Sequence, residues 1–415
     1  MLSSLQVTTA EITMKKSAFF DFLNNTDASQ FNEILQIGIE DQDYINWNEF
    51  LLPKDYGNAE QEYWAIRKSC ALFDVSPIRK ISIRGLAASR LLDHVLTRPV
   101  SSAENMRGIY VAYCNQDGSM KDDSILYKFS HDDYLLMPSD IDHSAYLNSF
   151  REHLAIGPED LTITDCTDDW HGVAVQGPQS ASVLASMGFD QVDELQPFEV
   201  RHYTVSDSNV VVARMGFTAD LGYEVWFQPN FTPVFQSLIQ RVRHTKAIAL
   251  PGYGLTALDA CRLEGALIVA GWDFSTEADP DPAFMRSPFE VGLGWLVNLK
   301  GQDFVGRDAL IQHTTGGQKF ALRQFKIDRH CDVQDGIAVY AMVNGSQETI
   351  GSVNCSAWSW GLESLIGNLS VNYHHSDCLD AWLIVKGERF DMRLSRGPFF
   401  NDPRRNQTPA ALLDY

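Results

Sequence analysis

The hydrophobic pattern of the sequence changes once, near residue 316, and this change constrains the fold more than any other feature. Before it, strand-like alternation and helix-like spacing follow one another; after TTGGQ at 314–318, only strand-like segments occur. These segments are KFALRQFKI, IAVYAMV, ETIGSVN, LIGNLSVN, AWLIVK and ERFDMRL, separated by Gly, Asn and Asp. We therefore expect an α+β region over residues 41–315 and a C-terminal β-barrel, or a sandwich, over residues 316–415.

Within the first of these regions, the pattern predicts helices in GNAEQEYWAIRKSC, in AASRLLDHVL and over residues 143–153. Strands are predicted in RKISIRG, GIYVAYCNQDG, DSILYKF, DDYLLMPS and near residues 170–175 and 209–214. The spacing is irregular and no glycine-rich phosphate loop is present, which favours an α+β fold over a doubly wound sheet.

The length and the apolar content allow more than one domain. With 415 residues, of which 45% are hydrophobic, the chain has enough apolar side chains for two or three cores. Residues 1–40 are polar and rich in Asn, Asp and Ser, so we expect a loosely packed extension there. The sequence shows neither the long apolar run of a membrane span nor the pattern of a secretion signal, and we expect neither.

Charge and cysteine usage narrow the range of partners. Lys and Arg number 33 against 54 Asp and Glu, and the resulting net charge of −21 opposes binding to nucleic acid and to anionic membranes. The seven cysteines are scattered, with no CxxC pair and no histidine-rich spacing, so we expect reduced thiols and no metal site. These features predict a cytoplasmic protein with small-molecule partners.

Asp122 and Asp123 form an adjacent acidic pair just before an alternating segment and after a hairpin turn at 115–118. In most sequences one aspartate of such a pair caps a turn and the other faces solvent. On a strand, neighbouring side chains point to opposite sides, so at most one of the two faces a given cavity.

Glu224 is a second candidate, because it lies between Tyr223 and Val225 in an aromatic, strand-like segment. A buried carboxylate needs a partner, and two kinds of partner suit it. One is an arginine such as Arg214 or Arg262. The other is a ligand with two adjacent N–H donors, such as the 2-amino and ring N–H edge of a pterin.

Eight motifs follow one another in an order typical of one family. They are FDVS (73–76), IYVAYCNQDG (109–118), DDSILY (122–127), VQGP (175–178), RMGFTADLGYE (214–224), RLEGAL (262–267), PFEVGLGWLV (288–297) and DFVGRDAL (303–310). Through these motifs, residues 46–398 resemble the glycine-cleavage T-protein, or aminomethyltransferase, superfamily. The segment GSVNCSAWSWGLESLIGNLSV is similar to that family's C-terminal barrel.

The resemblance implies a three-domain, cloverleaf-like fold, in which two interleaved, ferredoxin-like α+β domains bind tetrahydrofolate and a β-barrel follows. It implies that Asp123 is the catalytic residue, beside the folate nitrogen that receives the one-carbon group, and that Glu224 binds the pterin edge. It also implies that further residues bind the folate, namely Tyr110, Ile125, Tyr127, Phe217 and Trp295.

Several departures from the family pattern shift the expected activity away from glycine cleavage. Phe217 replaces a tyrosine, Ala219 and Asp220 replace Gly-Glu, and Leu258 replaces an arginine expected near the folate tail. The lead FLLPKDYGNAEQEYWAIRKSCALFDVS is more similar to the tetrahydrofolate-dependent demethylases, such as dimethylsulfoniopropionate demethylase. We therefore expect transfer of a one-carbon group from a small methylated S-, N- or O-compound to tetrahydrofolate.

Two other functions remain open. One is an aminomethyltransferase of a glycine-cleavage-type system, which takes its fragment from a carrier protein. The other is a non-catalytic, folate-binding regulatory protein, although the K-G-C-[YF]-x-G-Q-E segment of such relatives does not occur in this sequence.

The identity of the donor also remains open. Phe198, Tyr203 and Trp272 are candidate substrate contacts, because an aromatic ring suits a cation–π contact with a sulfonium or quaternary amine. The same rings are equally suited to a hydrophobic core.

Overall fold

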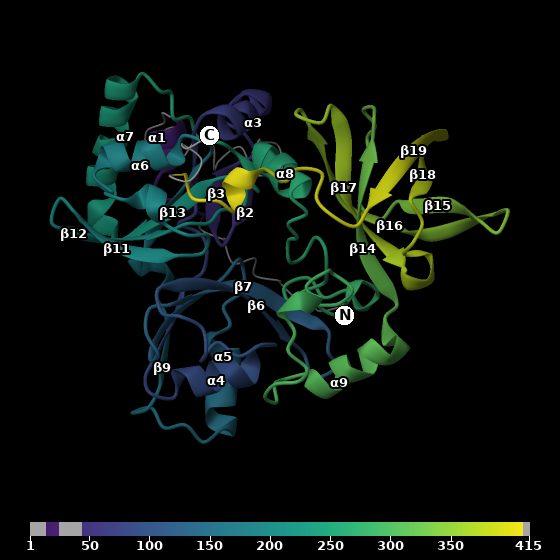
Figure 1. The fold of residues 1–415 in the computed structure, drawn as a ribbon, viewed down its shortest axis with the longest axis horizontal. Coiled ribbons are helices and arrows are strands. Elements are labelled where there is room, and N and C mark those ends of the chain that lie inside the picture. Colours follow the sequence, from purple (N-terminus) through teal and green to yellow (C-terminus); the bar gives the residue numbers. More distant parts are fainter. Residues whose placement is uncertain (1–13, 25–43, 410–415) are drawn as a thin grey trace, which may run out of the picture.

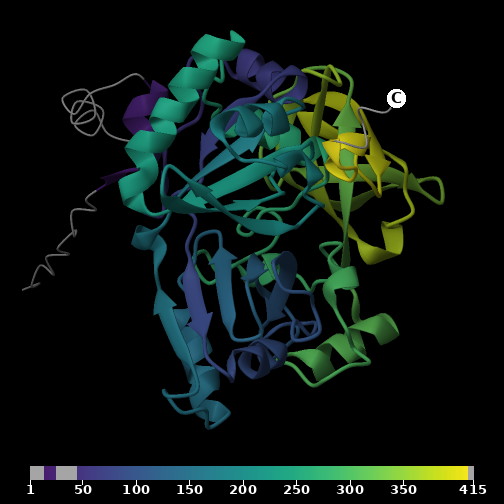
Figure 2. The same cartoon turned by 60° about the vertical axis from the view of Figure 1, so that its left-hand side comes forward.

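The structure, a computed structural model, describes residues 14–24 and 44–409. Two five-stranded antiparallel sheets and a closed six-stranded barrel make up most of this part of the chain (Figure 1). Helices pack on the two sheets, and the barrel lies to one side of them in both views (Figure 2). This arrangement confirms the predicted α+β fold with a C-terminal β-barrel.

One five-stranded sheet has the strand order β11-β12-β13-β10-β4. Its strands are β4 (Ala71–Asp74), β10 (His171–Gln176), β11 (Val200–Val205), β12 (Ser208–Ala213) and β13 (Gly222–Phe227). The helices beside it are α3 (Ala59–Lys68), α6 (Ser180–Met187), α7 (Thr232–Lys246) and α8 (Leu255–Glu264). Val173 and Val175 pack with α6 and α7, whereas Ala174 and Trp226 share a core with α3 and α8. Alternation along the strands thus buries both faces of this sheet.

The other five-stranded sheet has the order β6-β7-β8-β5-β9. Its strands are β5 (Ile81–Arg84), β6 (Arg107–Cys114), β7 (Met120–Lys128), β8 (Asp133–Pro138) and β9 (Thr162–Asp165). Helices α4 (Ala88–Val95) and α5 (Ser144–His153) share one core with Ile109, Val111 and Leu126. These side chains all lie on one face of β6 and β7, so the alternate residues form a second face away from α4 and α5.

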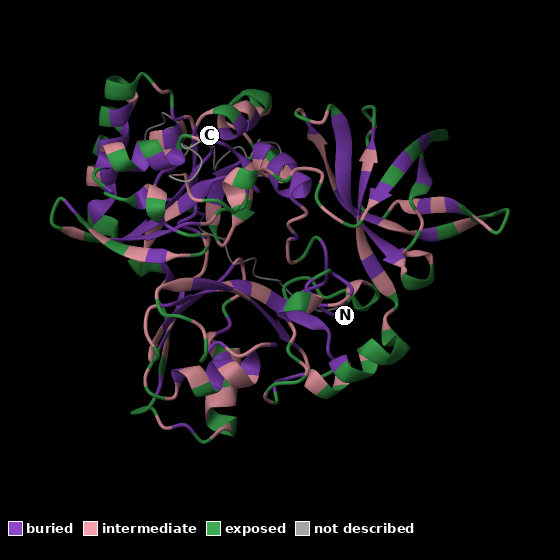
Figure 3. Cartoon of the chain, in the orientation of Figure 1, coloured by how far each residue is buried: buried purple, intermediate pink, exposed green. Residues whose placement is uncertain are grey.

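The barrel closes in the order β14-β17-β16-β15-β18-β19. Its strands are β14 (Phe320–Ile327), β15 (Ala338–Val343), β16 (Ser346–Ser359), β17 (Ser364–Asn372), β18 (Asp380–Val385) and β19 (Glu388–Ser395). Phe325, Leu369 and Leu383 are fully buried in its core. Each predicted strand of this region is present, and the open alternative between barrel and sandwich is decided in favour of a barrel. The barrel strands are largely buried, whereas the turns that connect them are exposed (Figure 3).

A small sheet, β1-β3-β2, joins the beginning of the described chain to the fold. Its elements are β1 (Lys15–Lys16), β2 (Tyr44–Trp47) and β3 (Phe50–Pro53), and helix α1 (Phe20–Asn24) follows β1. Phe19 is fully buried, and its backbone N donates to Asp74 Oδ2 at 2.6 Å. The prediction of a loosely packed extension is therefore wrong for residues 14–24, because aromatic side chains there enter the core. The rest of residues 1–40 lies outside the described part.

Short helical elements complete the described chain. They are α9 (Arg307–Gln312), the π turn His313–Gly317 and 3-10 turns at Thr167–Asp169, Val192–Glu194, Pro229–Phe231, Pro282–Phe284, Gly294–Leu296 (η6), Tyr373–His375 and Pro403–Arg405 (η9). After β19 the chain leaves the barrel and returns to the sheet that contains β13 (Figure 1). No helix of residues 14–24 and 44–409 has the length and apolar character needed to cross a bilayer.

Candidate active site

One face of the β6–β7 hairpin carries most of the predicted site. Strand register pairs Tyr110 with Ile125, and the same pairing places Asp123 and Tyr127 on this face. Tyr110, Asp123 and Ile125 remain partly accessible, whereas, apart from Arg107 at the start of β6, all other residues of the two strands are buried. A ligand therefore has access to these strands on the face opposite α4 and α5.

Asp123 lies within β7 and is held by two hydrogen bonds. Tyr110 Oη donates to Asp123 Oδ2 at 2.6 Å, and the backbone N of Asp123 donates to Asp122 Oδ1 at 2.9 Å. Burial, together with the charge of Asp122, raises the pKa of Asp123 to about 7, and the Tyr110 bond opposes that rise. A carboxyl group with such a pKa exchanges a proton readily near neutral pH.

Asp122 points the other way, into the core beneath the helices. His143 Nε2 donates to Asp122 Oδ2 at 2.8 Å, and Tyr113 Oη donates to the same oxygen at 3.4 Å. Both aspartates lie inside the strand, so the turn-cap interpretation of this pair is wrong and the alternation argument is confirmed. The sequence analysis did not identify His143, whose loop before α5 meets β7 only in three dimensions.

Trp295 extends the site beyond Tyr110. The two ring centroids are 6.0 Å apart, and the guanidinium of Arg98 lies 5.8 Å from the Trp295 ring centroid. Trp295 is 64% exposed, although the next residue in η6, Leu296, is fully buried. The structure thus brings Trp295, Tyr110 and Asp123 together.

Glu224 is partly accessible, whereas all other residues of β13 are buried. Its Oε2 accepts from Tyr127 Oη at 3.0 Å and from Trp226 Nε1 at 3.3 Å. No ion pair of the described chain includes Glu224, and neither Arg214 nor Arg262 reaches it, so the arginine alternative is wrong. Burial raises the pKa of Glu224 despite both hydrogen bonds.

This geometry fits a pterin edge. Within the described residues, both hydrogen bonds to the Glu224 carboxylate reach Oε2, and Oε1 has none. A carboxylate oxygen at a partly accessible position accepts from a ligand N–H without losing an existing bond. Tyr127 also connects the two sheets at this point, since it belongs to β7 and Glu224 to β13.

The loop before β13 is fixed by Gln176 at the end of β10. Thr218 Oγ1 donates to Gln176 Oε1 at 2.8 Å, while Gln176 Nε2 donates to Met215 O at 3.2 Å. A Cβ on Gly216 or on Gly222 would lie 2.0 Å from Gln176 Oε1, so a larger residue at either position would displace the Gln176 amide from these contacts. The loop thereby presents β13 in a fixed register.

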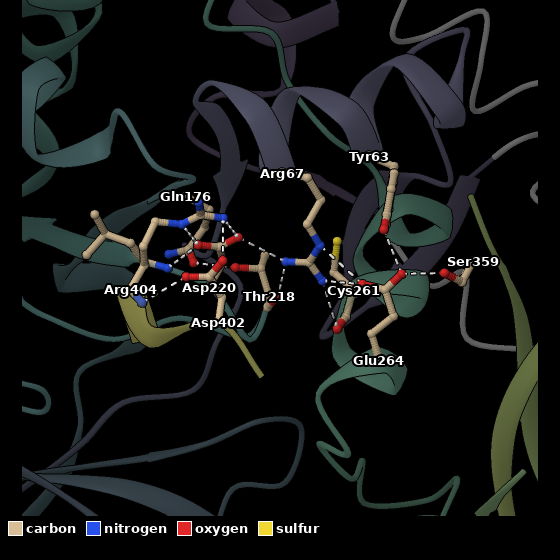
Figure 4. A network of polar contacts seen from close by, with 11 residues as sticks. Tyr63, Arg67, Gln176, Thr218, Asp220, Cys261, Glu264, Ser359, Asp402 and Arg404 are labelled. Atoms are coloured by element: carbon tan, nitrogen blue, oxygen red, sulfur yellow. Dashed lines mark hydrogen bonds and ion pairs between the residues drawn. The ribbon is translucent and has the colours of Figure 1, made fainter. Parts of the chain in front are cut away.

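Two buried carboxylates support the same loop and the adjacent α8 (Figure 4). Arg67 of α3 lies between them, with Nη2 2.6 Å from Glu264 Oε2 and Nη1 3.4 Å from Asp220 Oδ2. Arg404, on the C-terminal segment, donates to both oxygens of Asp220, at 3.0 and 3.1 Å. Ser359 of β16 donates to Glu264, which ties the barrel to the network. Asp220, a departure from the family pattern, is therefore an ion-pair partner of two arginines.

The remaining predicted site residues lie in different parts of the fold. Phe217 is 37% exposed in the loop before β13, and Phe198 is half-exposed beside β6, where its carbonyl accepts from Gly108 N. Trp272 covers the guanidinium of Arg262, at 5.1 Å. Tyr203 lies on the edge strand β11 with its ring against Phe189, away from the residues that hold Asp123 and Glu224.

Two further features bear on cofactors. Residues 14–24 and 44–409 contain no group of three or more His, Cys, Asp or Glu side chains placed to bind a metal ion. All seven cysteines are free thiols, and four of them are buried.

Residues 36–301 match the family described as the GCVT N-terminal domain, and this span is more than half of the chain. The chain belongs to this family. Among its relatives, the aminomethyltransferase of Thermotoga maritima is 29% identical over 283 residues, which are 68% of this chain and 73% of that protein. The trimethylamine-oxide aldolase of Ruegeria pomeroyi is 29% identical over 348 residues, which are 80% of this chain and 42% of that protein.

A solved structure shows the same fold for this GCVT-family protein. The glycine cleavage system aminomethyltransferase T from Bartonella henselae superposes with a TM-score of 0.76, over 95% of this chain and 99% of that one, at 19% identity. The comparisons thus confirm the predicted family and fold. They also confirm an enzyme that transfers one-carbon groups with tetrahydrofolate.

Proposed function

We propose that this GCVT-family protein is a demethylase, which transfers a one-carbon group from a small methylated sulfur, nitrogen or oxygen compound to tetrahydrofolate. The observation that carries the proposal is that two partly accessible carboxylates, Asp123 and Glu224, are joined through the side chains of one face of β7. Asp123 lies at one end, paired with Tyr110, and Glu224 lies at the other, paired with Tyr127. Ile125 lies between them on β7.

We infer that Glu224, with Tyr127 beside it, binds the pterin edge and sets the orientation of the ring. Tetrahydrofolate supplies a nitrogen that bonds to the methyl carbon as the carbon–donor bond breaks, with the electron pair leaving on the donor atom and the nitrogen losing its proton. The ionised carboxylate of Asp123 stabilises positive charge at that nitrogen and accepts the proton. Holding both reactants in place supplies much of the remaining rate.

The relatives support this proposal and its principal alternative. The protein from Ruegeria pomeroyi is named for trimethylamine oxide, a methylated nitrogen compound, which supports a small methylated donor. Other relatives are named aminomethyltransferases, so an aminomethyltransferase that depends on a carrier protein is the second candidate. A folate-binding protein without activity is the third, and it requires no role for Asp123.

A product assay separates the three functions. The protein is incubated with tetrahydrofolate and, in separate reactions, a panel of methylated sulfur, nitrogen and oxygen compounds or an aminomethylated carrier protein. The folate products are identified by mass spectrometry. Methyl-tetrahydrofolate indicates the demethylase, and methylene-tetrahydrofolate formed only with an aminomethylated carrier protein indicates the aminomethyltransferase. Binding without any product contradicts both.

The Asp123→Asn variant tests the assigned chemistry. It should keep tetrahydrofolate affinity and lose turnover by about 100-fold or more, as expected for a preorganised electrostatic group. Asp190→Asn is the matched control, because Asp190 is exposed and belongs to neither β7 nor β13. Near-normal turnover in Asp123→Asn would sink the assignment.

A further inference from the structure

Arg98 is fixed beside the Asp123 site by the backbone that carries it. The backbone N of Thr97 donates to Ala112 O at 3.0 Å, and Ala112 is the cross-strand neighbour of Asp123. Thr97 Oγ1 donates to Leu296 O at 2.9 Å, in the turn η6 that also carries Trp295. The residue before Arg98 is thus hydrogen-bonded both to β6 and to η6.

The guanidinium of Arg98 has no anionic partner. Within the part of the chain that the structure describes, it donates no hydrogen bond and forms no ion pair, although it is partly buried. Burial lowers the pKa of Arg98, and no neighbouring carboxylate opposes that shift. The group remains charged, because an arginine does not lose its proton in proteins. Its contact with the Trp295 ring leaves its N–H donors free.

Two buried arginines, Arg67 and Arg262, differ from Arg98 in this respect. Arg67 pairs with Glu264, and Arg262 pairs with Asp273. Arg151 and Arg405 are also partly buried and form no ion pair among the described residues, so Arg98 is set apart by its position against Trp295 rather than by its unpaired state alone. Its position against the exposed ring of Trp295, which in turn lies against Tyr110, points to a ligand as the partner.

We propose that Arg98 binds the carboxylate of a reactant at the Asp123 site. The planar guanidinium presents paired N–H donors that match the two oxygens of a carboxylate. This inference rests on the proposed function, which offers two sources of that group: a zwitterionic donor with a carboxylate opposite its methylated atom, and the glutamate of tetrahydrofolate. The rings of Trp295 and Tyr110, between Arg98 and Asp123, suit the cationic end of such a zwitterion.

The test compares Arg98→Gln with the wild type and with Arg151→Gln. Arg151 lies on α5, the helix that covers the opposite face, and forms no ion pair among the described residues. Calorimetry measures binding of tetrahydrofolate and of tetrahydropterin, which lacks the glutamate. The folate-loaded proteins are then titrated with dimethylglycine, glycine betaine and dimethylsulfoniopropionate, and with the carboxamide of each compound.

A donor carboxylate is indicated when the wild type prefers at least one acid over its amide by about 10- to 100-fold and only Arg98→Gln loses that preference. A folate carboxylate is indicated when Arg98→Gln binds tetrahydrofolate about 10- to 100-fold more weakly but tetrahydropterin normally. The inference is overturned when neither affinity changes by more than about twofold, the uncertainty of such comparisons. Failure of the wild type to bind tetrahydrofolate contradicts the proposed function itself.

Discussion

Tyr110 donates a hydrogen bond of 2.6 Å to Asp123 from the neighbouring strand, and this bond lowers a pKa that burial and Asp122 raise. The two residues are diagonal neighbours on one sheet face, since Tyr110 pairs with Ile125 and Ala112 with Asp123. Because Tyr110 stabilises the ionised form of Asp123, it lowers the pH at which this carboxylate becomes charged.

Tyr110→Phe should shift the pH dependence of turnover. Without its donor, the pKa of Asp123 rises further above about 7, so a larger fraction of the protein carries a protonated Asp123 at neutral pH. One hydrogen bond to a charged group contributes about 1.5 kcal/mol, which moves the acidic limb of kcat/KM upward by roughly one pH unit. Activity measured at pH 6 to 9 checks this expectation, and Tyr146→Phe, on α5, is the control. An unshifted limb contradicts the role of Tyr110.

Asp123→Asn should stabilise the protein at alkaline pH. The pKa of Asp123 is about 7 in the folded protein, above its usual value of 3.8, so ionisation of this group opposes folding. Ionisation of Asp123 therefore lowers the free energy of unfolding of the wild type as the pH rises from about 4 to 7. The asparagine variant has no ionisable group at this position and lacks this loss. Thermal unfolding at pH 5 and pH 8 tests this, and the gain in Tm should be larger at pH 8. A gain that is independent of pH argues against the raised pKa.

Glu224→Gln should weaken tetrahydrofolate binding by about 10- to 100-fold, because the charged acceptor for the pterin edge is lost. The fold should remain intact, since a glutamine oxygen still accepts from Tyr127 and Trp226. Equilibrium binding measures the effect, with Glu194→Gln in the exposed turn before β11 as the control. Unchanged affinity would remove Glu224 from the folate site.

Arg404→Ala should destabilise the protein by about 1–3 kcal/mol, because Asp220 is fully buried and loses one of its two arginine partners. The exposed pair of Arg396 with Asp377 provides the comparison, and Arg396→Ala should cost less than about 1 kcal/mol. Urea denaturation of both variants gives the two free energies of unfolding. Equal losses would show that the Arg404 contact contributes no more than a surface pair.

The acidic pair illustrates what the sequence pattern predicts and what it does not. Strand alternation correctly indicated that Asp122 and Asp123 face opposite sides, and turn residues correctly placed the hairpin at 115–118. The pattern did not indicate that β7 begins before the pair, at Met120, because two adjacent charges are atypical inside a strand. The interior position is stabilised by His143 and Tyr113, which lie elsewhere in the sequence.

Contacts between residues distant in the sequence also explain why the pattern did not identify two arginines. Arg98 was not identified, because its unpaired state is a property of its three-dimensional neighbours. The same holds for Arg404, which meets Asp220 from 184 residues away. The individual barrel strands, in contrast, followed from alternation and turn residues. The pattern left barrel and sandwich open, because closure depends on the pairing of β14 with β19, the first and last strands of this region.

The pairing of Asp220 with Arg404 has a consequence during translation. At a synthesis rate of about 5–20 residues per second, the 184 residues between them take roughly 10 to 40 s to add. During that interval the loop before Glu224 has Arg67 but not Arg404. The loop therefore acquires its second arginine contact late in synthesis, and a protease or chaperone that binds the nascent chain meets Asp220 before Arg404 has been added.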